Sequence, residues 1–238
     1  MVELLNVDCM EYMKTVPDKF FDLAIVDPPY GINVGKMAYL SEVKTTVRQK
    51  NGNKLNGNHN KRPYKKKEWD ESPPTQKYYD ELCRVSKNQI IFGIDYFAWV
   101  GVHSGRIIWD KGVPEGMSFN RYEKAFCSMF YDEIKLSLLW AGMQQAKSLS
   151  EPMVQQGNKA LNEKRIHPCH KPTLLYKALI RDYAKLGDKI LDTHLGSGSS
   201  AIAAHQMDFD FVGCEIDKDY YDAACKRFKE QTMQQKLF

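Results

Sequence analysis

The sequence predicts an α/β domain built on a mostly parallel sheet with helices on both faces. Short apolar runs, such as residues 21–26 and 189–192, indicate strands, and they alternate with segments of helical pattern, such as residues 173–185 and 219–229. This alternation favours parallel pairing, because each crossover helix returns the chain to the same end of the sheet. Ligands of such sheets bind beyond the carboxyl ends of the strands. We therefore expect the functional residues at that edge.

Length and composition indicate the domain number and the general class of the protein. The 238 residues are expected to form a single domain, residues 1–238, because one α/β domain routinely reaches this size. The net charge of +4 is too modest to indicate a nucleic-acid-binding protein by itself. The six cysteines lack C-x-x-C spacing, which predicts reduced thiols and a cytoplasmic protein. No apolar stretch approaches the roughly 18 residues of a membrane span, so no membrane partner is expected.

The first motif directly follows the apolar run at residues 21–26 and consists of Asp27, Pro28, Pro29 and Tyr30. Prolines fix φ and lack amide hydrogens, so the Pro28 carbonyl is expected to accept a hydrogen bond beside the Asp27 carboxylate. Two such acceptors can hold one exocyclic amino group, and the Tyr30 ring can stack on the flat base that carries it. We interpret these four residues as catalytic. The alternative is an ordinary loop that closes a buried strand.

The second motif follows the expected strand at residues 189–192. Thr193 to Gly198 form a glycine-rich turn, and a helical run begins at Ser199. Glycines let the backbone approach a ligand closely, and the start of a helix offers N–H groups to an anion. In nucleotide-binding α/β folds, an acid about twenty residues later takes the ribose hydroxyls, and Glu215 stands at that place. A nicotinamide oxidoreductase, or a plain glycine turn, is the alternative.

Together, the two motifs resemble the amino methyltransferases of DNA, which use S-adenosylmethionine (SAM) to methylate N6 of adenine or N4 of cytosine. The D-P-P-Y motif precedes the glycine loop, an order similar to that of the circularly permuted β class. The resemblance implies a Rossmann-like fold, SAM as cofactor and double-stranded DNA as partner, in a bacterium or a phage. Asp27 at the first motif position favours adenine. An N4-cytosine enzyme and a non-catalytic DNA-binding relative are the alternatives.

The resemblance also implies which residues hold the cofactor. Residues 167–172 look like the family's H-P-x-x-K-P segment, which precedes a helix lining the methionine end of SAM. Two positions depart from the family pattern: His194 stands where Phe is usual, and Cys169-His170 stands where Thr-Gln is more usual. The predicted cofactor-binding residues are Asp8, Asp27, Lys171, Thr173, Asp192, His194, Gly196, Gly198, Ser199 and Glu215. No metal is expected, because the His-x-Cys-His cluster lacks the separated ligand pairs of zinc sites.

The chemistry implied by the resemblance is a direct displacement at the SAM methyl group. Positive charge develops on the attacking amine, and the Asp27 carboxylate with the Pro28 carbonyl is expected to stabilise that charge more than the ground state. The target base must leave the duplex, at a cost of a few kcal/mol. Stacking on Tyr30 is expected to offset part of this cost.

Residues 31–69 are interpreted as a basic inserted loop, in which lysine and arginine far outnumber acids. Each phosphate that a protein neutralises makes DNA binding more sensitive to salt. The predicted phosphate-binding residues are Lys61, Arg62, Lys65, Lys66 and Lys67. The alternative is a solvated surface loop without a ligand, because charged runs are commonly just exposed.

Two further segments carry weaker signals. Residues 138–164 fall where the β class places its target-recognition region, and they contain amides of the kind that pair with adenine edges: Gln144, Gln145, Gln155, Gln156 and Asn158. A polar connection is the alternative.

Residues 230–238 form a C-terminal tail whose last five residues, Gln234–Phe238, resemble the Q-x-x-L-F peptides that dock in the bacterial replication sliding clamp. A frayed helix end is the alternative. The sequence leaves a homodimer open.

Overall fold

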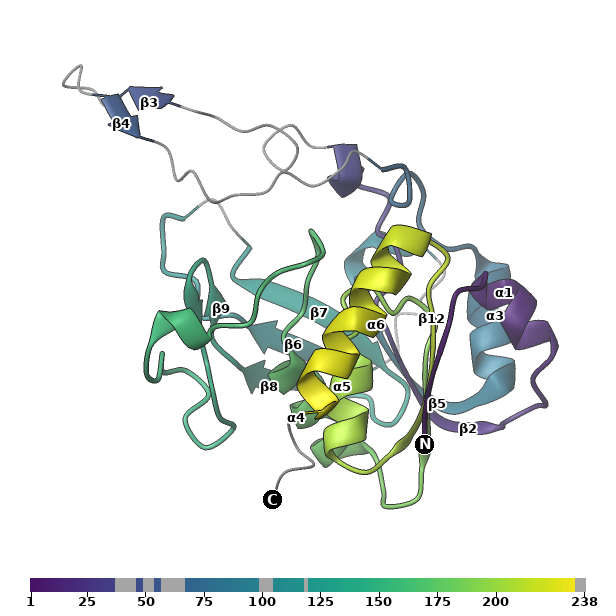
Figure 1. The fold of residues 1–238 in the computed structure, drawn as a ribbon. Helices are drawn as coiled ribbons and strands as arrows, with labels where there is room; N and C mark the ends of the chain where they lie inside the picture. Colours follow the sequence, from purple (N-terminus) through teal and green to yellow (C-terminus); the bar gives the residue numbers. More distant parts are fainter. Residues whose placement is uncertain (37–45, 49–53, 57–66, 99–104, 118–119, 234–238) are drawn as a thin grey trace.

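An eight-stranded sheet runs through the centre of the molecule (Figure 1). The computed structural model describes residues 1–36, 46–48, 54–56, 67–98, 105–117 and 120–233. The strands of the sheet are β1 (Val2–Leu5), β2 (Phe21–Val26), β5 (Ser86–Phe92), β6 (Gly105–Asp110), β7 (Tyr122–Cys127), β8 (Glu133–Ser137), β11 (Lys189–Asp192) and β12 (Asp210–Cys214). Their order is β1-β12-β11-β2-β5-β7-β6-β8, and within this sheet only β7 runs against its neighbours. The predicted mostly parallel sheet is confirmed.

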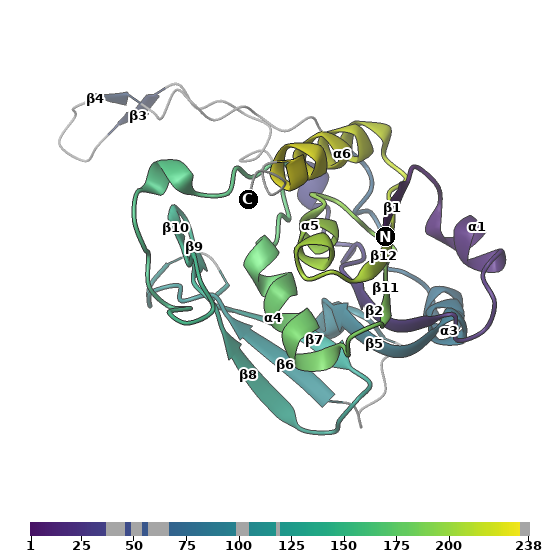
Figure 2. The same cartoon turned by 60° about the horizontal axis from the view of Figure 1, so that its bottom comes forward.

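Helices cover both faces of the sheet, as predicted (Figure 2). One face carries α4 (Thr173–Tyr183), α5 (Ser199–Gln206) and α6 (Lys218–Met233), and the other carries α1 (Cys9–Lys14) and α3 (Gln76–Val85). Each layer has its own core: Leu179 and Ala203 are buried on the first face, and Met13 and Leu82 on the second. The sheet is thus shielded from water on both sides, which explains why its central strands are largely apolar.

The strands that carry the two motifs are direct neighbours. β2 and β11 pair in parallel, with Ile190 opposite Leu23 and Leu191 opposite Ala24. β12 pairs in parallel with the other side of β11, and β1 pairs in parallel with β12. Because parallel neighbours end at the same edge of a sheet, the residues that follow these four strands share one edge. The catalytic motif and the glycine loop therefore meet there, although they lie far apart in the sequence.

The inserted segment at residues 31–69 contains the short elements η1 (Val34–Lys36), β3 (Thr46–Arg48) and β4 (Lys54–Asn56), and β3 pairs with β4 in antiparallel register. The sequence analysis assigned no strand here. Four of the predicted phosphate-binding residues, Lys61, Arg62, Lys65 and Lys66, lie outside the described residues.

The segment at residues 138–164 folds into a small hairpin of β9 (Trp140–Ala141) and β10 (Gln144–Gln145), followed by η3 (Lys159–Leu161). Most of its amides bond within the protein. The buried Gln145 side chain donates to the Glu163 carbonyl oxygen at 3.2 Å and accepts from the Glu163 N–H at 2.8 Å.

The remaining amides of this segment also have internal partners, apart from the exposed Gln144. The Gln155 Oε1 accepts from the Gln145 N–H at 2.7 Å, the Asn158 side chain caps η3, and Gln156 donates to Glu151. These amides close the hairpin and its connection, as the alternative of a polar connection implies, and a role of this segment in target recognition stays a prediction.

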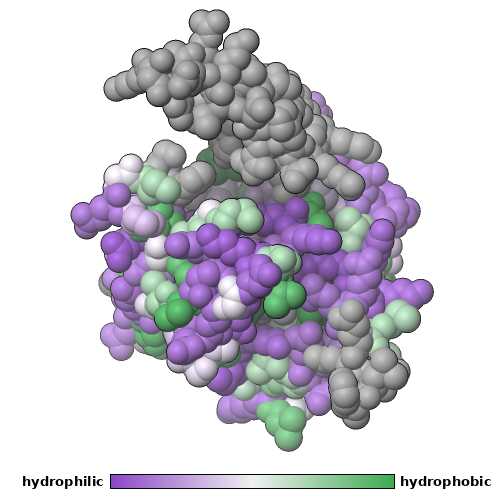
Figure 3. Space-filling model, turned by 60° about the vertical axis from the view of Figure 1, so that its left-hand side comes forward, coloured by the Kyte–Doolittle hydropathy of each residue, from purple (hydrophilic) through white to green (hydrophobic). Residues whose placement is uncertain are grey.

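Helix α6 ends at Met233, and the clamp-like peptide at residues 234–238 lies outside the described residues. Among the residues that the structure describes, no helix is long and apolar enough to span a membrane. Figure 3 shows one face of the molecule, on which hydrophilic residues dominate and apolar residues form small separate groups.

Candidate active site

A pocket of about 760 Å³ opens at the shared edge of the four strands. This volume lies within the usual range of small-molecule sites. Residues from both sequence motifs line it: Asp8, Asp27, Pro28, Pro29, Tyr30, His194, Gly196 and Glu215. Lys171 lines it too. The structure therefore brings together, in one pocket, most of the predicted catalytic and cofactor-binding residues; Thr173, Asp192, Gly198 and Ser199 are not among its lining residues.

Asp192 lies behind the pocket, although it was predicted to contact the cofactor. Its carboxylate accepts from the His194 N–H at 3.0 Å and from the Ser200 hydroxyl at 2.6 Å. Burial raises the pKa of Asp192 to about 7. Asp192 therefore fixes the start of the glycine loop, and its contact with the cofactor stays a prediction.

A buried ion pair supports the glycine loop from the same side. The Arg227 guanidinium on α6 donates to the Ser197 carbonyl at 2.7 Å and to the Ser199 hydroxyl at 2.9 Å. It also contacts Glu163 at 2.8 Å and the Thr173 hydroxyl at 3.0 Å. Thr173 and Ser199, predicted to bind the cofactor, are thus partners of Arg227. The sequence analysis missed Arg227 and Glu163 because neither belongs to a recognisable motif.

The glycine loop itself has the backbone that its sequence predicts. Gly196 and Gly198 have φ values of +51° and +73°, in the left-handed region that favours glycine. Gly198 also packs closely on α6, since a Cβ there would lie 3.3 Å from the Ala224 Cβ. The Glu215 carboxylate accepts from the Gly196 N–H at 2.8 Å and from the Asp217 N–H at 2.9 Å. Glu215 is therefore held against the loop at the pocket wall.

Asp8 and His194 lie at another part of the pocket wall. One oxygen of Asp8 caps α1 by accepting two backbone N–H groups of its first turn, at 2.7 and 3.3 Å. The His194 ring meets the Tyr78 ring edge-on at 5.5 Å. Burial lowers the pKa of His194 to about 4, so the ring is neutral near pH 7. His194 can therefore act as an uncharged aromatic ring, the property of the Phe that it replaces.

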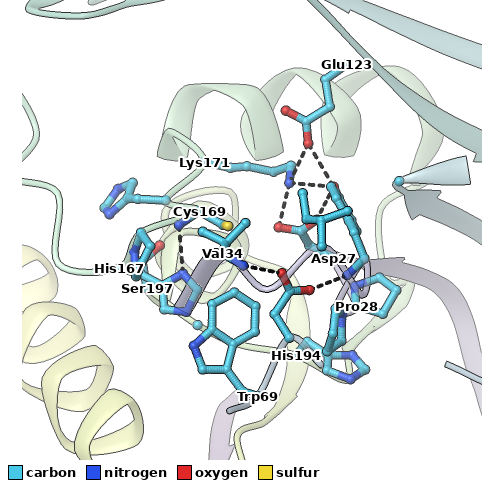
Figure 4. A pocket seen from close by; sticks show the side chains of 18 of the residues that line it. Asp27, Pro28, Val34, Trp69, Glu123, His167, Cys169, Lys171, His194 and Ser197 are labelled. Carbon is cyan, nitrogen blue, oxygen red and sulfur yellow. Dashed lines mark hydrogen bonds and ion pairs between the residues drawn. The ribbon is translucent and has the colours of Figure 1, made fainter. Parts of the chain in front are cut away.

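Asp27 lies in a buried cluster of ionisable side chains (Figure 4). The Lys171 Nζ is 2.5 Å from Asp27 Oδ2 and 2.8 Å from Glu123 Oε1. The Tyr30 hydroxyl is 2.7 Å from Asp27 Oδ1 and 2.8 Å from Glu123 Oε1. Lys111 approaches the other Glu123 oxygen at 3.5 Å. Lys171 was predicted to support the methionine end of the cofactor, but its ammonium contacts the catalytic motif.

The charges in this cluster shift one another's pKa values. Burial raises the pKa of Asp27, and the Lys171 charge opposes that effect. Burial also opposes ionisation of Glu123, but Lys171 and Lys111 bring its pKa down to about 2. Burial would lower the pKa of Lys171, yet the two carboxylates raise it above its usual range. Lys171 and Glu123 are therefore charged near neutral pH.

The Tyr30 ring is already stacked within the protein. It lies parallel to the Tyr96 ring, with centroids 5.0 Å apart and an interplanar angle of 13°. Gly93 makes room for it, because a Cβ there would lie 2.2 Å from a Tyr30 ring carbon. Tyr96 also lines the pocket and is 42% exposed. The sequence analysis assigned no role to Tyr96.

Asp70 fixes the backbone that follows the catalytic motif. Its Oδ1 accepts from the N–H groups of Tyr30 and Gly31 at 2.7 and 2.9 Å, and its Oδ2 accepts from the Val34 N–H at 2.8 Å. Gly31 has φ +73°, and a Cβ there would lie 2.5 Å from the Pro73 ring. Asp70, which directly follows the inserted loop, thus ties the two ends of that loop together. The sequence analysis did not identify it.

Lys67 has partners of its own. Its ammonium pairs with Asp217, contacts Asp219 at 3.1 Å and lies 4.4 Å from the centre of the Tyr220 ring. The Lys67 side chain is only 15% exposed. Two carboxylates thus neutralise the charge that was predicted to face DNA phosphates, and Lys67 instead joins the end of the inserted loop to the start of α6.

Trp69, His167 and Tyr220 form an aromatic wall of the pocket. The His167 ring centre is 5.0 Å from Trp69 and 4.4 Å from Tyr220. Burial lowers the pKa of His167 to about 3, so the wall is uncharged. The Trp69 Nε1 atom is buried and has no hydrogen-bond partner among the described residues. A buried donor without an acceptor costs about 1–3 kcal/mol, so its place in a pocket wall points to a ligand acceptor.

Known proteins with similar sequences or folds are DNA methyltransferases. A family model described as DNA methylase matches residues 39–226. The chain is 24% identical over 265 residues to the type II methyltransferase M.HinfI of Haemophilus influenzae, covering 95% of this chain and 68% of that protein.

Two solved structures share the fold. The M1.HpyAVI–SAM complex has a TM-score of 0.55 and 18% identity, covering 95% of this chain and 100% of that one. The cytosine-N4-specific PvuII DNA methyltransferase has a TM-score of 0.53 and 12% identity, covering 98% and 90%.

Proposed function

Because this chain belongs to the family of DNA methylases that act on exocyclic N6 or N4 amino groups, we propose that it methylates N6 of adenine in double-stranded DNA, with SAM as cofactor. The observation that carries the proposal is the pocket at the sheet edge, which Asp27 and Glu215 both line. Asp27 follows β2, and Glu215 is held to the glycine loop that follows β11. One pocket can therefore hold a methyl donor and an amine side by side.

The residues of the pocket fit SAM. The Glu215 oxygens can accept from ribose hydroxyls while they keep their backbone contacts, because each carboxylate oxygen has two lone pairs. Asp8 and the neutral His194 ring offer a polar and a flat surface for the adenine. The unpartnered Trp69 N–H offers a donor to an oxygen of the cofactor. When bound, SAM supplies a methyl group activated by the sulfonium charge.

The residues after β2 prepare the amine for attack. The Asp27 carboxylate and the Pro28 carbonyl accept the amino hydrogens and orient the nitrogen lone pair. As the nitrogen attacks, it becomes positive, and a buried carboxylate stabilises that charge more strongly than one in water would. The stacked rings of Tyr30 and Tyr96 offer a platform for the base, which leaves the duplex at a cost of a few kcal/mol.

Adenine is proposed over cytosine because the first motif position is Asp27. Nucleoside mass analysis of DNA treated with the protein and SAM tests the proposal. N6-methyladenine is the expected product. N4-methylcytosine in its place would support the cytosine alternative, and unmodified DNA from a folded, SAM-binding protein would contradict methyl transfer to DNA.

Four basic residues of the inserted loop, Lys61, Arg62, Lys65 and Lys66, are proposed to contact DNA phosphates. Neutralising Lys65 and Lys66 together should weaken binding and make the log–log salt dependence shallower by about 0.9 for each phosphate that the protein no longer neutralises. DNA binding measured between low and moderate salt checks this result. An exposed lysine at the far end of the sheet, Lys87, gives the matched control. An unchanged slope in the double variant would contradict the proposal.

Trp69→Phe should weaken SAM binding by about tenfold, because it keeps the aromatic wall but removes the indole N–H. Isothermal titration with SAM and with 5′-methylthioadenosine, which lacks the amino acid part, separates two positions for the acceptor. A loss seen with SAM alone places the acceptor on the carboxylate, and an equal loss with both ligands places it on the nucleoside. Unchanged affinity for both ligands would contradict the role of the indole N–H.

A further inference from the structure

Both carboxylate oxygens of the catalytic acid are engaged by other side chains of the protein. Lys171 contacts Asp27 Oδ2 at 2.5 Å, and the Tyr30 hydroxyl lies 2.7 Å from Oδ1. The Lys171 side chain is 5% exposed and that of Asp27 is 14% exposed, so water screens this ion pair little. A target amine needs these same oxygens. It therefore competes with the ammonium and the hydroxyl for Asp27, and the ammonium also offsets the negative charge of the carboxylate.

Glu123 is placed to receive both displaced groups. Its Oε1 is 2.8 Å from the Lys171 Nζ and 2.8 Å from the Tyr30 hydroxyl. Each group can therefore leave Asp27 and keep a charged partner without a large movement. Figure 4 shows Lys171 reaching between Asp27 and Glu123, which stand on opposite sides of its ammonium. Glu123 comes from β7, a strand without a catalytic motif, and the sequence analysis gave it no function.

We propose that Glu123 is a positioning residue that takes Lys171 and the Tyr30 hydroxyl from Asp27 when the target amine binds. This inference rests on the proposed methyl transfer to an exocyclic amine. The exchange has an electrostatic consequence, since an ammonium beside Asp27 would repel the positive charge that develops on the attacking nitrogen. Transfer of Lys171 to Glu123 leaves Asp27 with the amine as its only cationic partner. Glu123 thus makes the catalytic carboxylate available at the moment of reaction.

Three variants test the exchange, with kcat and KM for DNA and the Kd for SAM measured in each. In Glu123→Gln, Lys171 has only Asp27 as a carboxylate partner, so kcat/KM for DNA should fall by about tenfold or more. In Lys171→Met, the two buried carboxylates lose the cation between them and keep only Lys111 beside the far oxygen of Glu123, so the pKa of Asp27 rises further and kcat/KM should also fall. The double variant removes the competing ammonium together with the second carboxylate.

The double variant shows whether Glu123 acts through Lys171. If Glu123 acts through Lys171, Glu123→Gln with Lys171→Met should recover activity above either single variant, while the Kd for SAM stays within about twofold of the original protein. A purely structural role predicts additive losses, so a double variant no more active than Glu123→Gln would overturn the proposal. Lys87→Met, which removes the 2.6 Å ion pair to Asp22 at the other end of the sheet, is the matched control.

Assaying the original protein in parallel separates a failure of methyl transfer from a failure of the exchange at Asp27. If it transfers no methyl group to DNA, the proposed function fails; if it does and the double variant is not rescued, only the exchange fails. A crystal structure of the original protein with DNA and S-adenosylhomocysteine gives an answer that does not depend on the variants folding. Lys171 in contact with Glu123 and separated from Asp27 supports the exchange, and Lys171 still bound to Asp27 beside the flipped base overturns it.

Discussion

Replacing Asp27 by Asn should lower kcat for methyl transfer by about 10²–10³-fold or more and change the affinity for SAM little. The substitution keeps the shape of the side chain but removes the negative charge that is proposed to face the developing cation. It also turns one acceptor into an amide N–H group, which cannot accept from the target amine. Single-turnover methylation with labelled SAM, together with calorimetric SAM binding, measures the two effects separately.

Glu215→Ala should lower the affinity for SAM more than it lowers kcat. It removes the proposed ribose acceptor and leaves the N–H groups of Gly196 and Asp217 without their acceptor. SAM affinity should therefore fall by about tenfold or more. Asp22→Asn, near the start of β2 whereas Asp27 follows its end, serves as the control for Asp27→Asn and should keep kcat within about twofold. If Asp27→Asn retains kcat within tenfold of the original, Asp27 does not have the catalytic role assigned to it.

Asp70→Ala should be the substitution that most lowers the stability of the protein. Asp70 is 2% exposed and accepts three backbone N–H groups, each of which loses its acceptor when the carboxylate is removed. At about 1 kcal/mol or more for each group, the free energy of unfolding should fall by about 3 kcal/mol. For a chain of this size that corresponds to a drop in melting temperature of roughly 6–12 °C. Activity should fall as well, because the backbone of Tyr30 is released.

Asp70→Asn should remove only part of the hydrogen bonding that Asp70→Ala removes. Its amide oxygen can keep the contacts to Tyr30 and Gly31, whereas its NH2 group faces the Val34 N–H. The loss of stability should therefore be smaller than that of Asp70→Ala. Thermal melting and denaturant unfolding of both variants measure the order of the losses. Equal stability of Asp70→Ala and the original protein would show that this carboxylate does not hold the loop.

The sequence predicted the frame of the site because burial on both faces leaves a strong signal. Strands β2 and β11 have the predicted bounds, residues 21–26 and 189–192, since a parallel strand buried between two helical layers is mostly apolar. The glycine loop was recognisable for a related reason. Its left-handed residues and its close approach to α6 require glycine. A backbone conformation that requires glycine can be recognised from the residue type at that position alone.

The partners of individual polar side chains could not be predicted in the same way. A motif identified Lys171 but could not indicate whether its long side chain reaches the cofactor or Asp27. Arg227 and Glu163 meet only in the folded protein, and neither stands in a pattern. The same holds for Gln145, whose amide closes a hairpin although its residue type equally suits a DNA base. Such contacts depend on the tertiary arrangement.

A crystal structure of the protein with SAM would show whether one pocket holds the methyl donor beside Asp27. The ribose is predicted to contact Glu215, and the sulfonium methyl is predicted to point toward Asp27 and Pro28, with room between them for an amino group. A cofactor bound away from the glycine loop, or one whose methyl group points away from Asp27, would contradict the account.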